Sequence, residues 1–196
     1  MGRTRNFEEA EVLKKAMHAF RRYGYTSISI PYLVEATGLS AGSIYHNYTD
    51  KNGLFIAAFE HYLEHVLQRR LTQYTAQKKG LNGIRQLFLT LLEEPNDEHF
   101  GCLITNSAIE FGDDISVCKG AVQKGFDILL QILVDRLTTA KHHQQLREDM
   151  EPFVCAVKLL TLYQGILVMV RAGYDKAQLR SAIEQEFISM TNLNES

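Results

Sequence analysis

The stretch from Ser29 to Lys51 constrains the fold most, because it reads as two short helices joined by a turn of very few residues. Ser29 and Ser40 are residues of the type that cap helix N-termini, and Pro31 falls in a first turn, where its missing N–H costs little. Gly38 is predicted to end the first helix in the left-handed conformation. A connection this short makes the helices cross steeply, which predicts a helix-turn-helix unit.

The second of these helices carries the side chains suited to DNA. It opens at Ala41 with three very small residues, which cannot fill a core but allow a helix to press against base edges in a major groove. Polar or cationic side chains able to reach bases or phosphates follow: Tyr45, His46, Asn47, Tyr48 and Lys51. The alternative is an ordinary helical hairpin on the surface of a globular protein.

Three segments around this stretch resemble the TetR/AcrR family of bacterial one-component regulators. They read YGYTSIS (23–29), ATGLS (36–40) and SIYHNYTDKNGLF (43–55), and the resemblance extends from Phe7 to Leu63. Pro31, Tyr32 and Asn47 depart from the residues usual in the family. The resemblance implies that bases are contacted by Ala41, Gly42, Ser43, His46 and Asn47, and that phosphates are held by Ser29, Ser40, Tyr45 and Lys51.

The rest of the chain also predicts helices, because it has only 3 prolines and few alternating apolar runs. The expected all-α protein has an N-terminal three-helix DNA-binding head (1–51) and a larger body (52–196) for effector binding and dimerisation. Apart from the helix-turn-helix, periodic apolar residues place the helices near 7–23, 51–78, 84–94, 101–111, 115–139, 150–172 and 176–192.

Charge and cysteine content are consistent with an intracellular regulator. Residues 1–51 carry seven Lys or Arg against five Asp or Glu, a net charge of +2, which leaves −4 for the remainder of a chain of net charge −2. Three scattered cysteines indicate a reducing compartment rather than disulfides or a zinc site. The N-terminus has no secretory leader, and the apolar run 159–170 is too short for a membrane span, so we expect a bacterial cytoplasmic, nucleoid-associated protein.

No pattern in the chain predicts catalysis, a cofactor or a metal. The nucleophile elbow, the phosphate-binding glycine loop and the HExxH pattern are all missing from the sequence. His61 and His65 are spaced to share a metal ion, but no third ligand lies near them in the sequence, and we favour two solvated histidines. We therefore expect a protein that is not an enzyme.

A second informative stretch is GCLITNSAIEF (101–111), which resembles the start of helix 6 in one branch of the family. On a helix Cys102, Asn106 and Glu110 share one face among apolar neighbours, so we expect this polar row to face an effector pocket. The resemblance suggests apolar walls from Phe59, Tyr62, Phe88, Phe126 and Tyr163. The alternative is structural: Asn106 and Glu110 would satisfy buried helix ends or pair with Arg171, and Cys102 would be a small core residue. A carboxylate beside Cys102 would raise the pKa of its thiol, which favours simple ligand binding over covalent sensing.

The helix expected at 150–172 is apolar on nearly all sides, so a partner subunit is needed to cover it, with residues such as Leu167 pointing outward. We expect the last two helices, 150–172 and 176–192, to pair with their symmetry mates in a four-helix bundle. We therefore expect a homodimeric repressor that joins a double-stranded DNA operator through its two heads and leaves it when a small-molecule effector binds. The alternative of another class is a cytosolic helical ligand carrier or enzyme whose DNA-binding head is vestigial.

Overall fold

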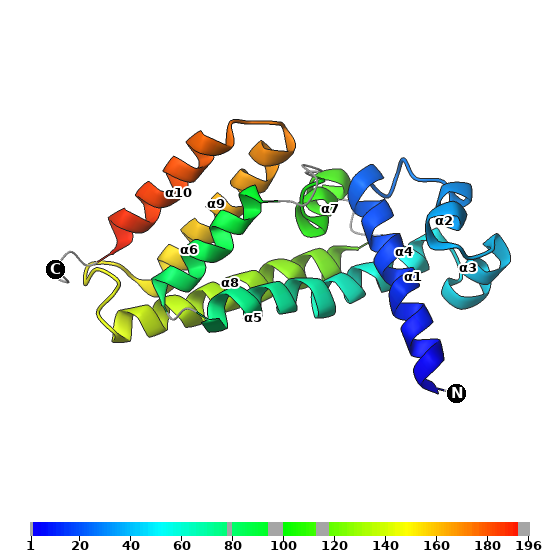
Figure 1. Ribbon diagram of the computed structural model, residues 1–196, viewed down its shortest axis with the longest axis horizontal. Coiled ribbons are helices and arrows are strands. Elements are labelled where there is room, and N and C mark those ends of the chain that lie inside the picture. Colours follow the sequence, from blue (N-terminus) through cyan, green and yellow to red (C-terminus); the bar gives the residue numbers. More distant parts are fainter. Residues whose placement is uncertain (1, 78–79, 94–99, 113–117, 192–196) are drawn as a thin grey trace. The chain divides into compact units, whose positions relative to one another are not determined.

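The computed structural model describes residues 2–77, 80–93, 100–112 and 118–191, and the described residues are helical apart from connections and one isolated bridge between Leu146 and Thr191. They form two compact units (Figure 1). Unit 1 comprises residues 1–68 and 100–125, and unit 2 comprises residues 69–99 and 126–196. These are divisions by compactness, and the functional boundary at residue 51 stays a prediction.

Unit 1 is built around the first four helices and α7. Its elements are α1 (Gly2–Tyr23), α2 (Ile30–Thr37), α3 (Ala41–Tyr48), α4 (Lys51–His61), η1 (Tyr62–Leu67) and α7 (Leu103–Phe111), with the beginning of α8 (Lys119–His142). Its core gathers large side chains that are almost fully buried: Met17, Phe20, Leu33, Ile44, Leu54, Phe55, Phe59 and Leu63. Phe20 and Phe55 meet edge to face with ring centroids 4.8 Å apart. This apolar contact fixes α4 against α1.

The long helix predicted from residue 51 to 78 is interrupted in a way that the sequence did not predict. It consists of α4, the π-helical segment η1 and α5 (Gln68–Gln77) in direct succession. A π-helical turn inserts one residue into the α-helical pattern and thereby rotates the side chains that follow it. The periodicity of apolar residues does not reveal such an insertion.

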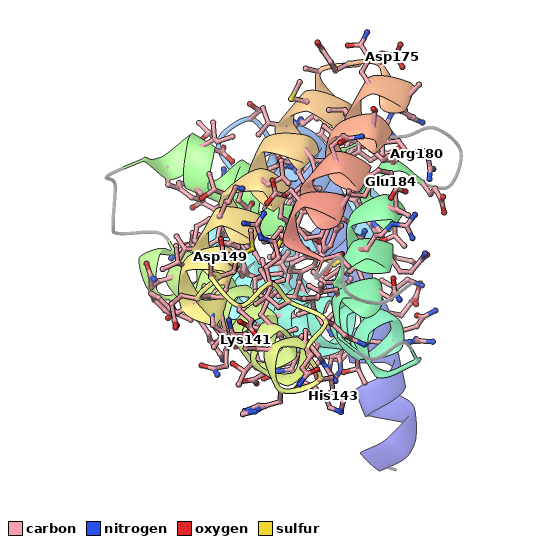
Figure 2. The ribbon with its side chains drawn as sticks, turned by 90° about the vertical axis from the view of Figure 1, so that its left-hand side faces the viewer. Lys141, His143, Asp149, Asp175, Arg180 and Glu184 are labelled. Atoms are coloured by element: carbon pink, nitrogen blue, oxygen red, sulfur yellow. The ribbon has the colours of Figure 1, made fainter. Side chains whose placement is uncertain are left out.

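Unit 2 packs α6 (Leu81–Leu89), the 3₁₀ turn η2 (Thr90–Leu92), α9 (Pro152–Arg171) and α10 (Lys176–Met190) around a second core. Phe88 meets Tyr163 and Phe187 edge to face, each pair at 5.4 Å between centroids. At the edge of this core Arg85 of α6 makes a two-pronged ion pair with Glu184 of α10, at 2.5 and 2.6 Å. Figure 2 shows Glu184 and Arg180 on α10, and Lys141 near the end of α8.

Several predicted helix bounds are wrong. The first helix begins at Gly2 rather than Phe7, so Arg3 and Arg5 belong to its first turns, and their side chains lie outside the described residues. The helix expected to begin at residue 84 begins at Leu81 instead, directly after Gly80, which adopts a positive φ of 65°. The helix α8 extends to His142, and the ammonium of Lys141 in its last turn donates to the carbonyls of the connection that follows, those of Arg147, Glu148 and Met150.

The apolar helix α9 is buried on one side only. By length and composition it could cross a bilayer, and seven of its residues are buried in unit 2. Leu167, which we expected to point outward, is among them at 7% exposure. Five other apolar residues of α9 are exposed instead: Phe153, Val154, Val157, Val168 and Met169.

Candidate DNA-binding interface and the polar row of α7

The helix-turn-helix forms as its capping residues predict. Ser29 caps α2 by accepting a hydrogen bond from the Tyr32 N–H at 3.4 Å, and Ser40 caps α3 by accepting from the Ser43 N–H at 3.1 Å. Gly38 ends α2 in the left-handed conformation (φ 77°), and its N–H donates to the Val34 carbonyl at 2.9 Å. The two short helices are therefore fixed by local bonds as well as by burial of Leu33 and Ile44.

Helix α3 presents most of its surface outward. Ile44 is its one buried residue, whereas Ala41, Gly42, Tyr45, His46 and Asn47 are exposed and Ser43 is half-buried. Two of the residues predicted to contact bases, Ser43 and Asn47, already have internal partners. The Ser43 hydroxyl lies 2.9 Å from the Ser40 hydroxyl, and the Asn47 side-chain amide donates to the Ser43 carbonyl at 2.9 Å. The Asn47 oxygen is not part of that bond and remains suited to an exocyclic amine of a base.

The corner between α3 and α4 is tighter than the sequence suggested. Thr49 has a positive φ of 71° with ψ of −50°, and the Asp50 N–H donates to the Tyr48 carbonyl at 2.8 Å, which closes a γ-turn. Asp50 then caps α4 by accepting from the Gly53 N–H at 2.8 Å. A Cβ on Gly53 would overlap the Tyr48 carbonyl oxygen, so a side chain there would push the two helices apart. Sequence reasoning missed this corner, although aspartate is among the preferred N-cap residues.

Lys51 is half-buried, and its ammonium has partners within the head. Its ammonium donates to the Tyr25 carbonyl at 3.0 Å and to the Ile28 carbonyl at 3.2 Å, and it lies 4.4 Å from the centre of the Tyr25 ring. Two of its three donors thus hold the connection between α1 and α2. These contacts do not test whether Lys51 reaches a phosphate, but they give it a second role that the sequence did not indicate.

Two protein-family models match the chain, one over the helix-turn-helix region and one over the C-terminal region. Residues 12–58 match the bacterial regulatory proteins of the tetR family, and residues 80–185, more than half of the chain, match the C-terminal domain described as tetracyclin repressor-like. The chain belongs to the TetR family. It is accordingly a DNA-binding transcriptional regulator, and the family consists of regulators rather than enzymes.

Individual TetR-family proteins are similar over part or most of the chain. The uncharacterized HTH-type transcriptional regulator YezE of Bacillus subtilis is 34% identical over 113 residues, which span 56% of this chain and 58% of YezE. The HTH-type transcriptional repressor Rv1474c of Mycobacterium tuberculosis is 26% identical over 176 residues, or 89% of this chain and 88% of that protein. A cysteine mutant of the regulator CifR, complexed with 26-base-pair operator DNA, has the same fold at a TM-score of 0.80 and 20% identity, covering 92% of this chain and 95% of CifR.

The polar row predicted to face an effector has partners within unit 1. Cys102 occupies the N-cap position of α7 instead of a place inside the helix, and its thiol lies 3.1 Å from the Tyr62 hydroxyl. The Asn106 amide donates to the carbonyls of Arg21 (3.0 Å) and Phe100 (2.8 Å). Glu110 accepts from the N–H groups of Tyr25 (2.9 Å) and Thr26 (2.6 Å). Asn106 thus bonds to a carbonyl at the end of α1, as the structural alternative expects, whereas Glu110 bonds to N–H groups of the connection that follows α1. Whether the row faces an effector stays a prediction.

The five aromatic residues predicted as pocket walls are divided between the units. Phe59 and Tyr62 are buried in unit 1, whereas Phe88 and Tyr163 are buried and Phe126 is half-buried in unit 2. Their gathering around one pocket stays a prediction.

The three cysteines are buried, and two histidines lie beside each other on α4 and η1. Burial raises the pKa of the Cys118 thiol to about 12 and also raises the pKa of Cys155, while Cys102 is 6% exposed. The His61 and His65 rings are 4.7 Å apart, and burial together with His65 lowers the pKa of His61. No group of three potential metal ligands forms in the part of the chain that the structure describes.

Proposed function

We propose that the protein is a homodimeric repressor that binds a pseudo-palindromic operator through α3 and leaves it when a small molecule binds the C-terminal region. The observation that carries the proposal is the surface of α3, where Ile44 alone is buried and small or polar side chains face outward. A helix of this kind fits a major groove, and two copies reach half-sites about 34–36 Å apart.

Within that proposal, base edges are read by Ala41, Gly42, Ser43, His46 and Asn47, and phosphates are held by Ser29, Ser40 and Tyr45. The exposure of Tyr45 (53%) supports a phosphate contact by its hydroxyl. The Ser29 and Ser40 side chains act as caps, so they present the exposed N-termini of α2 and α3 to the backbone of the DNA. We assign Lys51 two roles: its charge attracts DNA phosphates, and its ammonium holds the α1–α2 connection in place.

The proposed dimer uses the exposed apolar face of α9. Val154, Val157 and Val168 recur at helical spacing on that face, and Gly165 lies among them with nothing within 4 Å of an added Cβ. Apolar surface of this extent on a helix that is otherwise part of a core favours burial against a second copy, in an isologous interface. Ile188 of α10 is also exposed, at 56%, so α10 stays part of the proposed interface.

The effector is proposed to be a small molecule with a few polar groups in an otherwise apolar surrounding. It releases the operator because it binds the operator-free conformation better than the operator-bound one, and the shift equals that difference in affinity. A protein of this kind acts in the bacterial cytoplasm, on the nucleoid.

Selection from a library of random duplexes tests the proposal, because the protein itself then chooses the operator sequence. The full-length protein should enrich a pseudo-palindrome, with two protomers bound per site or a multiple of two. Enrichment without two-fold symmetry, or no enrichment over repeated rounds, would contradict it and favour a carrier or enzyme with a vestigial head.

A further inference from the structure

The helix α7 belongs to the C-terminal region by sequence but to the head's compact unit by structure. The tetracyclin repressor-like domain match covers 80–185, which includes α7, whereas α7 lies beside α1 in unit 1 (Figure 1). It is therefore a part of the C-terminal region that contacts α1 and the connection into α2 directly.

The contacts of α7 converge on the end of α1 and on the connection into α2. Gly24 ends α1 with φ of 78°, and the two following N–H groups, of Tyr25 and Thr26, both point at the Glu110 carboxylate. Successive N–H groups after such a left-handed residue form a concavity that favours an anion. One helix turn earlier on α7, the Asn106 amide donates to the Arg21 carbonyl, at the end of α1 where carbonyls have no partner within the helix.

Tyr25 is held from two sides as a result. Glu110 of α7 accepts its N–H, and Lys51 of α4 donates to its carbonyl. Its ring lies 5.6 Å from the ring of Phe111, the last residue of α7, and 5.0 Å from Phe55 of α4. The connection that leads to Ser29, the cap of α2, is thus fixed jointly by α4 and α7.

From this convergence we infer that Asn106 and Glu110 are positioning residues for operator binding, which set the orientation of the helix-turn-helix against α4. The inference rests on the proposed function and replaces the predicted effector contacts of these two side chains. An effector that displaces α7 would then release the end of α1 and the entry into α2 together.

The direction in which DNA affinity changes when Glu110 loses its charge distinguishes a positioning role from an effect of the charge alone. Removing a carboxylate from the DNA-binding unit reduces repulsion of phosphates and should strengthen binding to any duplex. Loss of the two charge-assisted bonds that fix Tyr25 and Thr26 should weaken it. The test compares Glu110→Gln with Glu35→Gln, which removes the same charge from the exposed surface of α2. The probe is the duplex selected by the full-length wild-type protein, titrated by fluorescence anisotropy well below the melting temperature.

We expect Glu110→Gln to bind this duplex at least tenfold more weakly with an unchanged salt slope, and Glu35→Gln to bind equally or more tightly. Asn106→Asp, which places a carboxylate against two carbonyl oxygens, should weaken binding similarly. Hydrogen exchange at Tyr25 and Thr26 should accelerate in Glu110→Gln. A stoichiometric titration with the duplex gives the fraction of each protein that is active. Partial unfolding lowers this fraction without changing the affinity of the remaining protein, whereas a positioning defect lowers the affinity itself.

Wild-type-like operator affinity in both Glu110→Gln and Asn106→Asp would overturn the inference while leaving the proposed function intact. Weakening that is fully accounted for by a lower active fraction would overturn it too. Failure of the proposed function is a different result, since the wild-type protein would then select no duplex.

Discussion

Replacing Lys51 by methionine separates its role in holding the connection between α1 and α2 from a contact with a DNA phosphate. Methionine keeps the length and apolar stem of the side chain but removes the ammonium, so the carbonyls of Tyr25 and Ile28 lose their charged donor. The ring of Tyr25 also loses its cation partner at 4.4 Å.

The size of the effect follows from these contacts. A hydrogen bond to a charged group contributes roughly 1.5–3 kcal/mol, and an exposed cation–π contact about 0.5–1 kcal/mol. Lys51 is half-buried, so water replaces part of what is lost, and we expect a destabilisation of about 2–4 kcal/mol. For a chain of this length each kcal/mol lowers Tm by about 2–4 °C. The expected decrease in Tm is therefore on the order of 10 °C.

Differential scanning calorimetry at fixed protomer concentration measures this change, with Lys14→Met as the matched control. Lys14 has a 56% exposed side chain and a long 3.8 Å ion pair with Glu11, so its removal should shift Tm by no more than about 2 °C. A pure phosphate contact predicts the opposite pattern for Lys51→Met, namely an unchanged Tm and a salt slope of operator binding reduced by about one. That pattern would refute the positioning role.

Three further results are expected. Val168→Glu should convert the dimer into monomers or aggregates in analytical ultracentrifugation, whereas Gln73→Glu, which adds the same charge on α5, should leave it dimeric; a dimeric Val168→Glu would place the interface elsewhere. The hydrogen bonds from Arg85 lower the pKa of Glu184 from its ordinary value of 4.5, so their stabilisation is present at neutral pH and lost as pH falls through the lowered pKa. The Tm gap between wild type and Glu184→Gln should accordingly narrow as pH falls below the ordinary pKa of a glutamate, and a gap that stays constant through the acid range would exclude this linkage. All three cysteines are buried, so iodoacetamide should label them slowly in the native protein and quickly in urea; fast native labelling of any one would show that its thiol is accessible.

The sequence predicted those parts of the fold that depend on local bonds. Ser29, Gly38 and Ser40 act within a few residues of themselves, and the structure confirms the caps and the turn predicted from them. Residue type and spacing were sufficient there, because a cap needs only its own helix.

The remaining features depend on partners that are distant along the chain. Lys51 bonds to carbonyls 23 and 26 residues away, and Glu110 accepts from N–H groups 84 and 85 residues away. Helical periodicity placed Asn106 and Glu110 on one face correctly but could not say what that face meets. The π-helical segment that begins at Tyr62 was not predicted either, because a single inserted residue does not change the composition of the helix noticeably.

The most direct test of operator recognition is the affinity of the full-length wild-type dimer for its selected duplex and for a scrambled duplex of the same length, measured from low to physiological salt. We predict that the selected duplex binds about a thousandfold or more tightly at physiological salt, and that affinity for both falls linearly with salt on logarithmic axes. Equal affinity for the two duplexes, or an affinity that does not change with salt concentration, would contradict the claim that this repressor recognises its operator through α3.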